Sequence, residues 1–190
     1  MMKRLLYLTL FVVVLAASAL TTTARAEGKG FYPGGQLKWE YLFQDGEIRE
    51  AKWYNEAGQL TSRELYAAGQ PEKTEGYRPD GSLEWQVRQL ADNRQEVTRF
   101  NESGQITTRY QLLGGQLDGE HTTFSADGQA QQTVTYRQGV LDGPARTFFS
   151  SGQVEHEFTY RSGKVDGLYR TYSAEGQLLT EYTFSAGQLQ

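Results

Sequence analysis

Residues that could carry out chemistry are few in this chain and lie far apart. The histidines, His121 and His156, fall in different segments, and His156-Glu157 supplies two metal ligands where a zinc site needs at least three. Glu155 and Glu157 have the spacing of two carboxylates on one strand face, which glycoside hydrolysis could use, but we interpret them as solvated residues. Without cysteine there is no thiol nucleophile, and no Gly-x-Ser-x-Gly motif occurs. We therefore predict no catalytic, cofactor-binding or metal site, no small-molecule substrate, and a protein that is not an enzyme.

Three Asp-Gly pairs, Asp118-Gly119, Asp142-Gly143 and Asp166-Gly167, recur at a regular spacing that is typical of calcium-binding repeats. Each pair supplies a single carboxylate, whereas calcium takes about six to eight oxygen ligands. Turn formation explains an Asp-Gly pair without any metal. We therefore expect these residues to shape the backbone.

An aromatic residue followed four positions later by glycine recurs along the chain. The steps between these glycines are 23, 23, 23, 24, 24 and 24 residues. The pairs are Phe31/Gly35, Tyr54/Gly58, Tyr77/Gly81, Phe100/Gly104, Phe124/Gly128, Phe148/Gly152 and Tyr172/Gly176. A short repeat held over seven copies indicates an array of similar units that bury their core between neighbours. Such arrays favour a binding or structural protein.

Within each copy, apolar and polar residues alternate. Counted from the repeat glycine, positions two to eight of the first copy place Leu37, Trp39, Tyr41 and Phe43 on one side. This period of two predicts a strand with one buried face. Position eleven is a second glycine in every copy but the third, where Asp92-Asn93 replaces it. Both residue types tolerate the left-handed conformation of a turn.

The repeat predicts an all-β fold: an elongated antiparallel meander of seven β-hairpin repeats with 13 or 14 short strands. The extra residue in the 24-residue copies predicts a bulge or a widened turn. We expect irregular repeats over 27–103, with the third copy the least regular, and regular repeats over 104–190.

Residues 1–26 have the features of a secretory signal peptide. Lys3 and Arg4 precede an apolar run over 5–20, and Ala24-Arg25-Ala26 forms an A-x-A cleavage pattern. We predict cleavage after Ala26, a mature repeat domain over 27–190 that starts at Glu27, and export to the periplasm or the medium. The alternatives are an uncleaved anchor and a buried helix, although the apolar run is shorter than the roughly 20 residues of a spanning helix.

The mature chain would carry 16 basic and 23 acidic residues. This balance gives no electrostatic reason to bind nucleic acid or anionic lipid, and it favours a basic protein partner. We therefore expect membrane contact only through the signal segment.

The three tryptophans, Trp39, Trp53 and Trp85, all lie in the first half of the chain. Trp39 and Trp85 share position four, and we expect them to stack on the buried face. Trp53 has the opposite parity to Tyr54 and is our candidate for a partner-binding surface anchor, because interface hot spots favour tryptophan.

The chain resembles the MORN-repeat variant family, in which a Gly-x-Leu-x-Gly spacer separates aromatic strands. The matching segments are Gly115–Gly119 with Phe124 and Gly128, Gly139–Gly143 with Phe148 and Gly152, and Gly163–Gly167 with Tyr172 and Gly176. The resemblance implies an array of β-hairpins used for interaction, and it supplies no catalytic residue. Many bacterial members are labelled YwqK-type antitoxins, which implies a toxin-neutralising or immunity partner.

These observations favour an exported protein that acts through protein–protein interaction, with a basic toxin as the implied partner. Two alternatives remain open at this point: a module that binds cell wall or carbohydrate through its aromatic residues, and an envelope scaffold that self-associates through open sheet edges.

Overall fold

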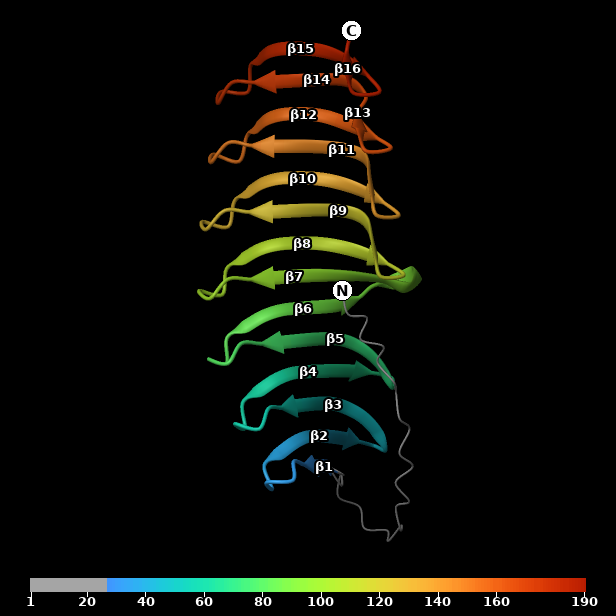
Figure 1. Ribbon diagram of the computed structural model, residues 1–190, viewed down its shortest axis with the longest axis vertical. Coiled ribbons are helices and arrows are strands. Elements are labelled where there is room, and N and C mark those ends of the chain that lie inside the picture. The colour runs from blue at the N-terminus through green and yellow to red at the C-terminus, as the bar shows by residue number, and fades with distance from the viewer. Residues whose placement is uncertain (1–26) are drawn as a thin grey trace.

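The predicted all-β meander is confirmed. A computed structural model describes residues 27–190, which form one antiparallel sheet of 16 strands that lie in sequence order, apart from one short strand that lies off this path (Figure 1). The proposed signal segment, 1–26, lies outside the described residues. The strands are β1 (Glu27–Phe31), β2 (Leu37–Gln44), β3 (Glu47–Tyr54), β4 (Leu60–Ala67), β5 (Gln70–Tyr77), β6 (Leu83–Gln89), β7 (Arg94–Phe100), β8 (Ile106–Leu113), β9 (Gln116–Phe124), β10 (Ala130–Arg137), β11 (Val140–Phe148), β12 (Val154–Arg161), β13 (Lys164–Val165), β14 (Gly167–Tyr172), β15 (Leu178–Ser185) and β16 (Gln188–Leu189).

Glycine at position zero is the last residue of each turn that joins consecutive strands on one side of the sheet. In the second copy, the Gly58 amide donates to the Asn55 carbonyl and the Asn55 amide donates to the Gln59 carbonyl, both at 2.9 Å. Gly58 has a φ of +75° and is therefore the left-handed residue at the end of a three-residue hairpin loop. The repeat spacing is therefore the spacing of a turn that requires positive φ.

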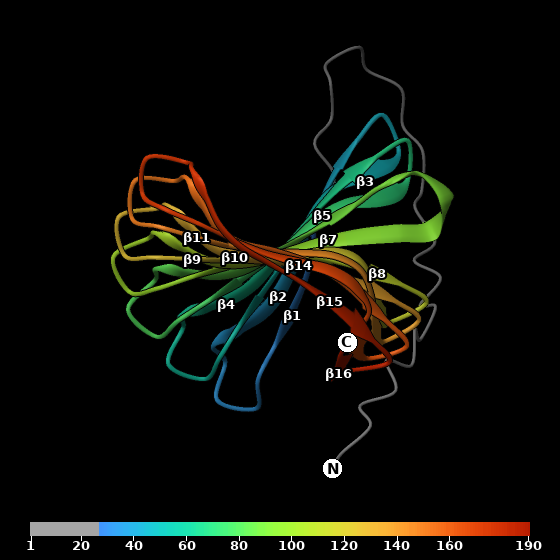
Figure 2. The ribbon, with the colours of Figure 1, turned by 90° about the horizontal axis from the view of Figure 1, so that it is seen from above.

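Two-residue turns join consecutive strands on the opposite side of the sheet. Asp45 and Gly46 have φ values of +51° and +81°, and Gln138-Gly139 and Ser162-Gly163 repeat this pair of positive values. Positive φ at both central residues defines a type I′ turn, whose twist matches that of the flanking strands. The twist accumulates along the sheet, so that successive strands fan out when viewed along the long axis (Figure 2).

The third copy differs from the other copies in its second turn. Its turn is a short 3₁₀ segment, η1 (Ala91–Asn93), in which Asp92 and Asn93 take φ values of +58° and +59° as expected. However, β6 and β7 pair without any register shift, whereas β2–β3 and β4–β5 each contain one. The third copy therefore carries its extra residue in the turn, whereas the other early copies carry it as a bulge.

The bulge predicted for the 24-residue copies is confirmed. Between β8 and β9, Tyr110 pairs with His121 and the next pair is Leu112 with Leu117, so the ladder is interrupted around Gly119. Gly119 has φ +115°, and a Cβ there would lie 2.5 Å from the Gln111 side chain. In the last of these copies, the same feature divides the strand into β13 and β14 around Asp166.

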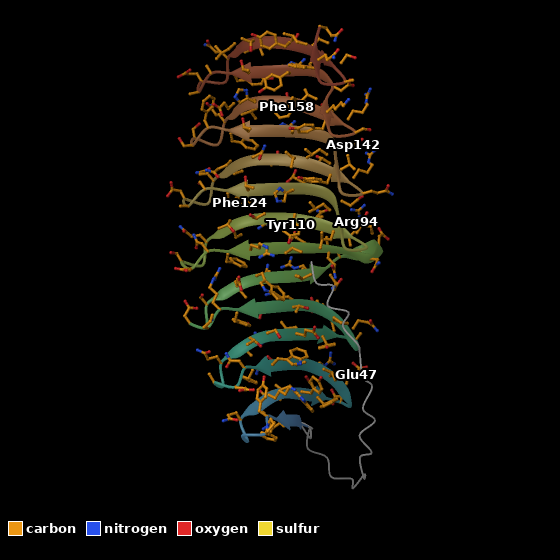
Figure 3. The ribbon with its side chains drawn as sticks, in the orientation of Figure 1. Glu47, Arg94, Tyr110, Phe124, Asp142 and Phe158 are labelled. Carbon is orange, nitrogen blue, oxygen red and sulfur yellow. The ribbon has the colours of Figure 1, made fainter. Side chains whose placement is uncertain are left out.

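The sheet has two chemically different faces. Directly paired residues share a face, so the row Tyr110, His121, Val134, Ala145 and Phe158 lies on one side, which we call the aromatic face. Val134, Ala145 and Phe158 form its buried cluster, with Tyr136, Tyr160 and Tyr169 packed against it. We call the other side the charged face. Figure 3 places Tyr110 and Phe158 midway along their strands and Phe124, Arg94 and Asp142 towards the strand ends. Within 27–190, no helix has the length and apolar character needed to cross a membrane.

Candidate interaction surface

The aromatic face carries ring contacts from strand to strand in the later copies. The His121 ring centroid lies 5.7 Å from that of Tyr110 and 6.0 Å from that of Tyr136. Tyr169 stacks on Phe158 at 5.0 Å and contacts Phe184 at 5.9 Å. The described residues form a single sheet, so no second layer from 27–190 covers these rings. The face is therefore a continuous, partly exposed apolar surface.

A second cluster of rings occupies the same face in the first copies. Trp39 stacks on Tyr41 at 4.7 Å, and Tyr41 meets Trp53 at 6.1 Å with an interplanar angle of 77°. Trp39 and Trp53 are direct cross-strand partners. A Cβ at Gly30 would lie 2.2 Å from the Trp39 ring, so only glycine allows the indole to lie flat across β1.

Trp53, the predicted surface anchor, is half-buried and belongs to this cluster. Its role in partner binding stays a prediction. The expected stacking of Trp39 on Trp85 is wrong, because β2 and β6 are four strand spacings apart, about 19 Å. Trp85 instead covers Gly76 on β5, where a Cβ would lie 2.1 Å from the indole.

One carboxylate, Glu64, lies among the aromatic residues of the first copies. Ala51 pairs with Tyr41 on one side and with Glu64 on the other, so all three share the aromatic face. The Tyr66 hydroxyl donates to Glu64 Oε2 at 2.5 Å. Burial, followed by this bond to Glu64, raises the pKa of Tyr66.

The charged face contains a cross-strand ladder that alternation alone does not reveal. Glu40, Lys52, Arg63 and Glu75 pair in sequence from β2 to β5. Lys52 Nζ lies 3.6 Å from Glu40, and Arg63 Nη1 lies 3.5 Å from Glu75. Burial alone would raise the pKa of Glu75, but hydrogen bonds from Lys73 and Tyr77 and the charge of Arg63 outweigh burial and lower it.

The ladder resumes at the other end of the sheet. Arg146 Nη2 lies 2.6 Å from Glu157, and Arg170 Nε lies 2.7 Å from Glu181. The middle of the same row holds Arg109 between the uncharged, buried Thr98 and Thr122. Four cations of this face, Lys52, Arg63, Arg146 and Arg170, therefore each contact a carboxylate within the sheet, and much of the charge on this face is already paired.

The aromatic residues that lie four positions before each repeat glycine contact the charged face near the strand ends. The Tyr54 hydroxyl donates to Glu40 at 2.7 Å, and the Tyr77 hydroxyl donates to Glu75 at 2.6 Å. Burial, followed by the bond to Glu40, raises the pKa of Tyr54 to about 12. The next three copies have phenylalanine at this position, Phe100, Phe124 and Phe148, and the Arg109 guanidinium lies 5.8 Å from the Phe124 ring centroid.

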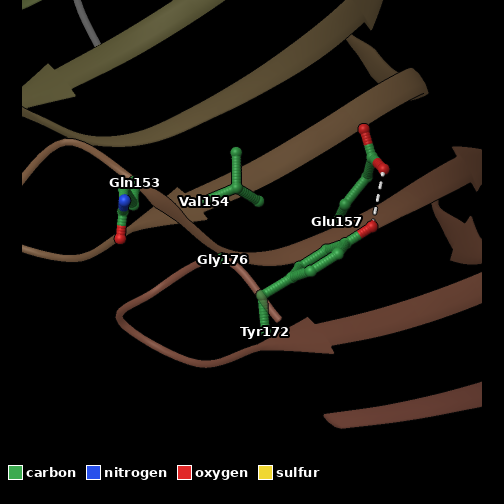
Figure 4. Close-up of a pocket in the computed structure, with 5 residues that line it drawn as sticks. All are labelled: Gln153, Val154, Glu157, Tyr172 and Gly176. Atoms are coloured by element: carbon green, nitrogen blue, oxygen red, sulfur yellow. Dashed lines mark hydrogen bonds between the residues drawn. The ribbon is translucent and has the colours of Figure 1, made fainter. Parts of the chain in front are cut away.

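A hollow of about 270 Å³ lies beside the equivalent aromatic of the last full copy, Tyr172 (Figure 4). Its other lining residues are Gln153, Val154, Glu157 and Gly176. The Tyr172 hydroxyl lies 3.5 Å from Glu157 Oε2, and Glu157 also pairs with Arg146. The hydroxyl of Tyr172 and the carboxylate of Glu157 therefore already have partners within the fold.

The Asp-Gly aspartates connect successive copies. Asp118 accepts a hydrogen bond from the Gln138 amide at 3.1 Å, Asp142 accepts one from Ser162, and Asp166 accepts one from Ala186. Each donor lies in the two-residue turn of the following copy. The Gln138 amide, followed by Arg94 at 2.7 Å, lowers the pKa of Asp118. These carboxylates thus have a structural use beyond the turn formation that we predicted.

The remaining candidates for chemistry are also held in structural contacts. Burial lowers the pKa of His121, and His156 Nδ1 lies 3.1 Å from the Tyr169 hydroxyl. Glu155 contacts Thr147 and His156, whereas Glu157 pairs with Arg146 on the charged face. The bulge at Glu155 breaks the alternation, so the two carboxylates do not share a face as the sequence pattern suggested. No three potential metal ligands gather among residues 27–190.

Comparison with known proteins supports the repeat assignment. Residues 141–162 and 165–186 each match the family model for the MORN repeat variant. Among curated proteins, no match is found. Two solved structures of TarM show low similarity: an S. aureus mutant in complex with fondaparinux, α-GlcNAc-glycerol and UDP (12% identity, TM-score 0.40, 54% of this chain and 20% of that chain) and a second TarM structure (12% identity, TM-score 0.37, 50% and 19%). This chain spans about a fifth of the length of either.

The two matched copies contain the Leu141-Asp142-Gly143 and Val165-Asp166-Gly167 segments whose aspartates bind the following turn. The earlier copies repeat the same hairpin and the same glycine turn. The resemblance seen in the sequence is thereby confirmed over residues 141–186, and the chain is a repeat protein whose last copies match the MORN repeat variant.

Proposed function

We propose that this protein is a non-enzymatic binding protein that holds another protein against its aromatic face. The observation that carries this proposal is the strand-to-strand series of partly exposed rings, which no second layer of the described chain covers. Aromatic residues dominate the energetics of protein interfaces. The charged face is the weaker candidate because its ladder pairs its own charges, and exposed ion pairs contribute little.

In its finer form, the proposal is that the protein neutralises a basic toxin in the periplasm or outside the cell. The signal-like segment 1–26, the acidic balance of the mature chain and the labels attached to related repeat proteins support this reading. The aromatic face would block the toxin by covering its active surface.

The test compares two double variants, one altered on the aromatic face and the other altered at neighbouring positions on the charged face. Tyr110→Ser/Tyr182→Ser removes two rings from the aromatic face, and Arg109→Ser/Glu181→Ser changes the neighbouring residues on the charged face. Each double variant replaces at least one exposed residue, so we expect each to fold, and circular dichroism would check this. Each protein, starting at Glu27, is used to capture partners from envelope and secreted fractions, followed by mass spectrometry.

We expect the wild type and the charged-face variant to retain one dominant protein that the aromatic-face variant loses. Equal retention by both variants would refute the aromatic face as the binding surface. The captured protein is then produced in cells with and without this chain. Growth arrest that this chain relieves would support toxin neutralisation, and an absence of any growth effect would reject it.

A carbohydrate ligand is the second candidate, because sugars also stack on exposed rings such as Tyr182 on the aromatic face. Retention on peptidoglycan or glycan resins that the Tyr110→Ser/Tyr182→Ser variant loses would favour it over a protein partner. If neither resin retains the wild type, this candidate is rejected.

A further inference from the structure

The three tryptophans of the aromatic face have two different electrostatic surroundings. Trp39 and Trp53 face each other across β2 and β3, with Tyr41 in ring contact with both. Trp85 instead pairs directly with Arg99, an exposed cation on β7. A positive charge therefore already lies beside Trp85, whereas the residues that pair with Trp39 and Trp53 are uncharged.

Glu64 adds a negative charge beside the first of these tryptophan environments. It lies on the aromatic face, one strand beyond Ala51 and two residues before Tyr66. Ala51 is fully buried and pairs with Tyr41 on one side and with Glu64 on the other, so these two positions flank it on the aromatic face. Tyr66 donates one hydrogen bond to Glu64, and no ion pair within 27–190 involves Glu64.

Other carboxylates of the early copies have a different arrangement. Glu40, Glu50 and Glu75 lie on the charged face, and each has Lys52, Arg63 or Lys73 within 4 Å. Glu64 therefore differs from them in two respects: it lies on the face that carries the rings, and its one side-chain partner is a neutral hydroxyl. A carboxylate in apolar surroundings gains most from a cation that completes its hydrogen bonding.

We propose that Trp39, Tyr41, Trp53 and Glu64 form a subsite for an arginine or lysine side chain of the partner protein. The rings cover the aliphatic stem and attract the cation through their π faces, and Glu64 pairs with the charged head. Charge complementarity selects this occupant, because the mature chain is acidic and the one charge in the cluster is negative. This inference rests on the proposed function, since it names the chemistry that the aromatic face recognises.

A pair of small probes tests the subsite without knowledge of the partner. Nα-acetyl-arginine methylamide carries the cation, and Nα-acetyl-citrulline methylamide has nearly the same shape without charge. Tryptophan is replaced by 5-fluorotryptophan in the 27–190 chain, and the three ¹⁹F signals are assigned with single Trp→Phe variants. Titration then reports separately on Trp39, Trp53 and the control Trp85.

We expect the arginine probe to shift the Trp39 and Trp53 signals with an affinity about fivefold higher than that of the citrulline probe, since a cation–π contact at an exposed site contributes about 1 kcal/mol. The Trp85 signal should not move. Glu64→Gln should lower the preference for arginine, because it removes the ion pair and leaves only the cation–π contacts. Glu96→Gln, which alters a partly exposed carboxylate on the opposite face, should leave the preference unchanged. Dispersed ¹⁹F signals in both variants show that they are folded.

Equal affinity for the two probes, an unchanged preference in Glu64→Gln, or an equal shift at Trp85 would each overturn the subsite. These outcomes leave the proposed function standing if the Tyr110→Ser/Tyr182→Ser variant still loses its partner. Conversely, partner capture that ignores the aromatic face refutes the proposed function, even where the arginine probe binds at Trp39 and Trp53.

Discussion

Replacing Phe158 with alanine should remove the largest side chain of the buried cluster. Phe158 is 9% exposed and contacts the rings of Tyr160 and Tyr169 at 5.3 Å and 5.0 Å. Phenylalanine-to-alanine changes in protein cores cost about 3–5 kcal/mol. One side of this sheet is open, so neighbouring rings can relax into the space, and we expect the lower end, about 3 kcal/mol. With a urea m-value of about 2 kcal/mol/M, the midpoint should fall by about 1.5 M.

The tryptophan positions allow the affected copies to be observed separately. Trp39, Trp53 and Trp85 all lie in the first three copies, so their fluorescence reports on that half, whereas far-UV circular dichroism reports on the whole sheet. Because each copy contacts only its neighbours, Phe158→Ala should move the dichroism transition to lower urea and leave most of the fluorescence transition in place. Thr159→Ala, on the charged face of the same strand, should change stability by less than about 0.5 kcal/mol.

Two results would refute this reasoning. A loss smaller than about 1 kcal/mol would mean that the Phe158 cluster does not stabilise the later copies as its burial indicates. Equal displacement of the two transitions would mean that the sheet unfolds as one cooperative unit, and that the nearest-neighbour description of the array is wrong.

Three further predictions follow from single features of the fold. Gly76→Ala should displace the indole of Trp85, because its Cβ would lie 2.1 Å from that ring, and the tryptophan emission maximum should shift to longer wavelength as the ring gains solvent. Asp118→Asn should weaken the hydrogen bond that the Gln138 amide donates to this side chain. The pKa of Asp118 is lowered in the fold, so the stability that the carboxylate adds is present above about pH 4 and is lost as the pH falls through the folded pKa. Urea midpoints of wild type and variant should therefore differ at pH 7 and converge progressively as the pH falls below about 4, and a constant difference would contradict the assignment. Mass spectrometry of the exported protein should show an N-terminus created by cleavage after Ala26, and an intact N-terminus would indicate the uncleaved anchor.

The hairpin array could be predicted because its signals are local. Glycine at position zero marks a backbone that needs positive φ, and the alternation around Trp39 and Tyr41 has the period of a strand. The position of the extra residue in the third copy could not be predicted, because a turn and a bulge can each accommodate one residue. Asp92-Asn93 indicated the turn residues correctly, but the pairing of β6 with β7 depends on where the chain accommodates that residue.

Features that depend on pairing across strands could not be predicted. The charged ladder from Glu40 to Glu75 joins residues from four strands, and it emerges only once the register is known. The same applies to the position of Glu64 among the rings. The Trp39–Trp85 prediction failed for a related reason: equivalent positions in alternate copies are separated by the width of the intervening strands.

Because each Asp-Gly aspartate binds only the next copy, the length of this sheet can change in steps of one copy. Asp118, Asp142 and Asp166 each reach a residue 20 positions further on, and none of these bonds extends past the next copy. Duplicating one 24-residue segment would therefore lengthen the sheet by two strands, about 10 Å, and create one more bond of the same kind. Evolution can thus match the reach of this surface to a longer or shorter partner in fixed increments, without redesigning any existing contact.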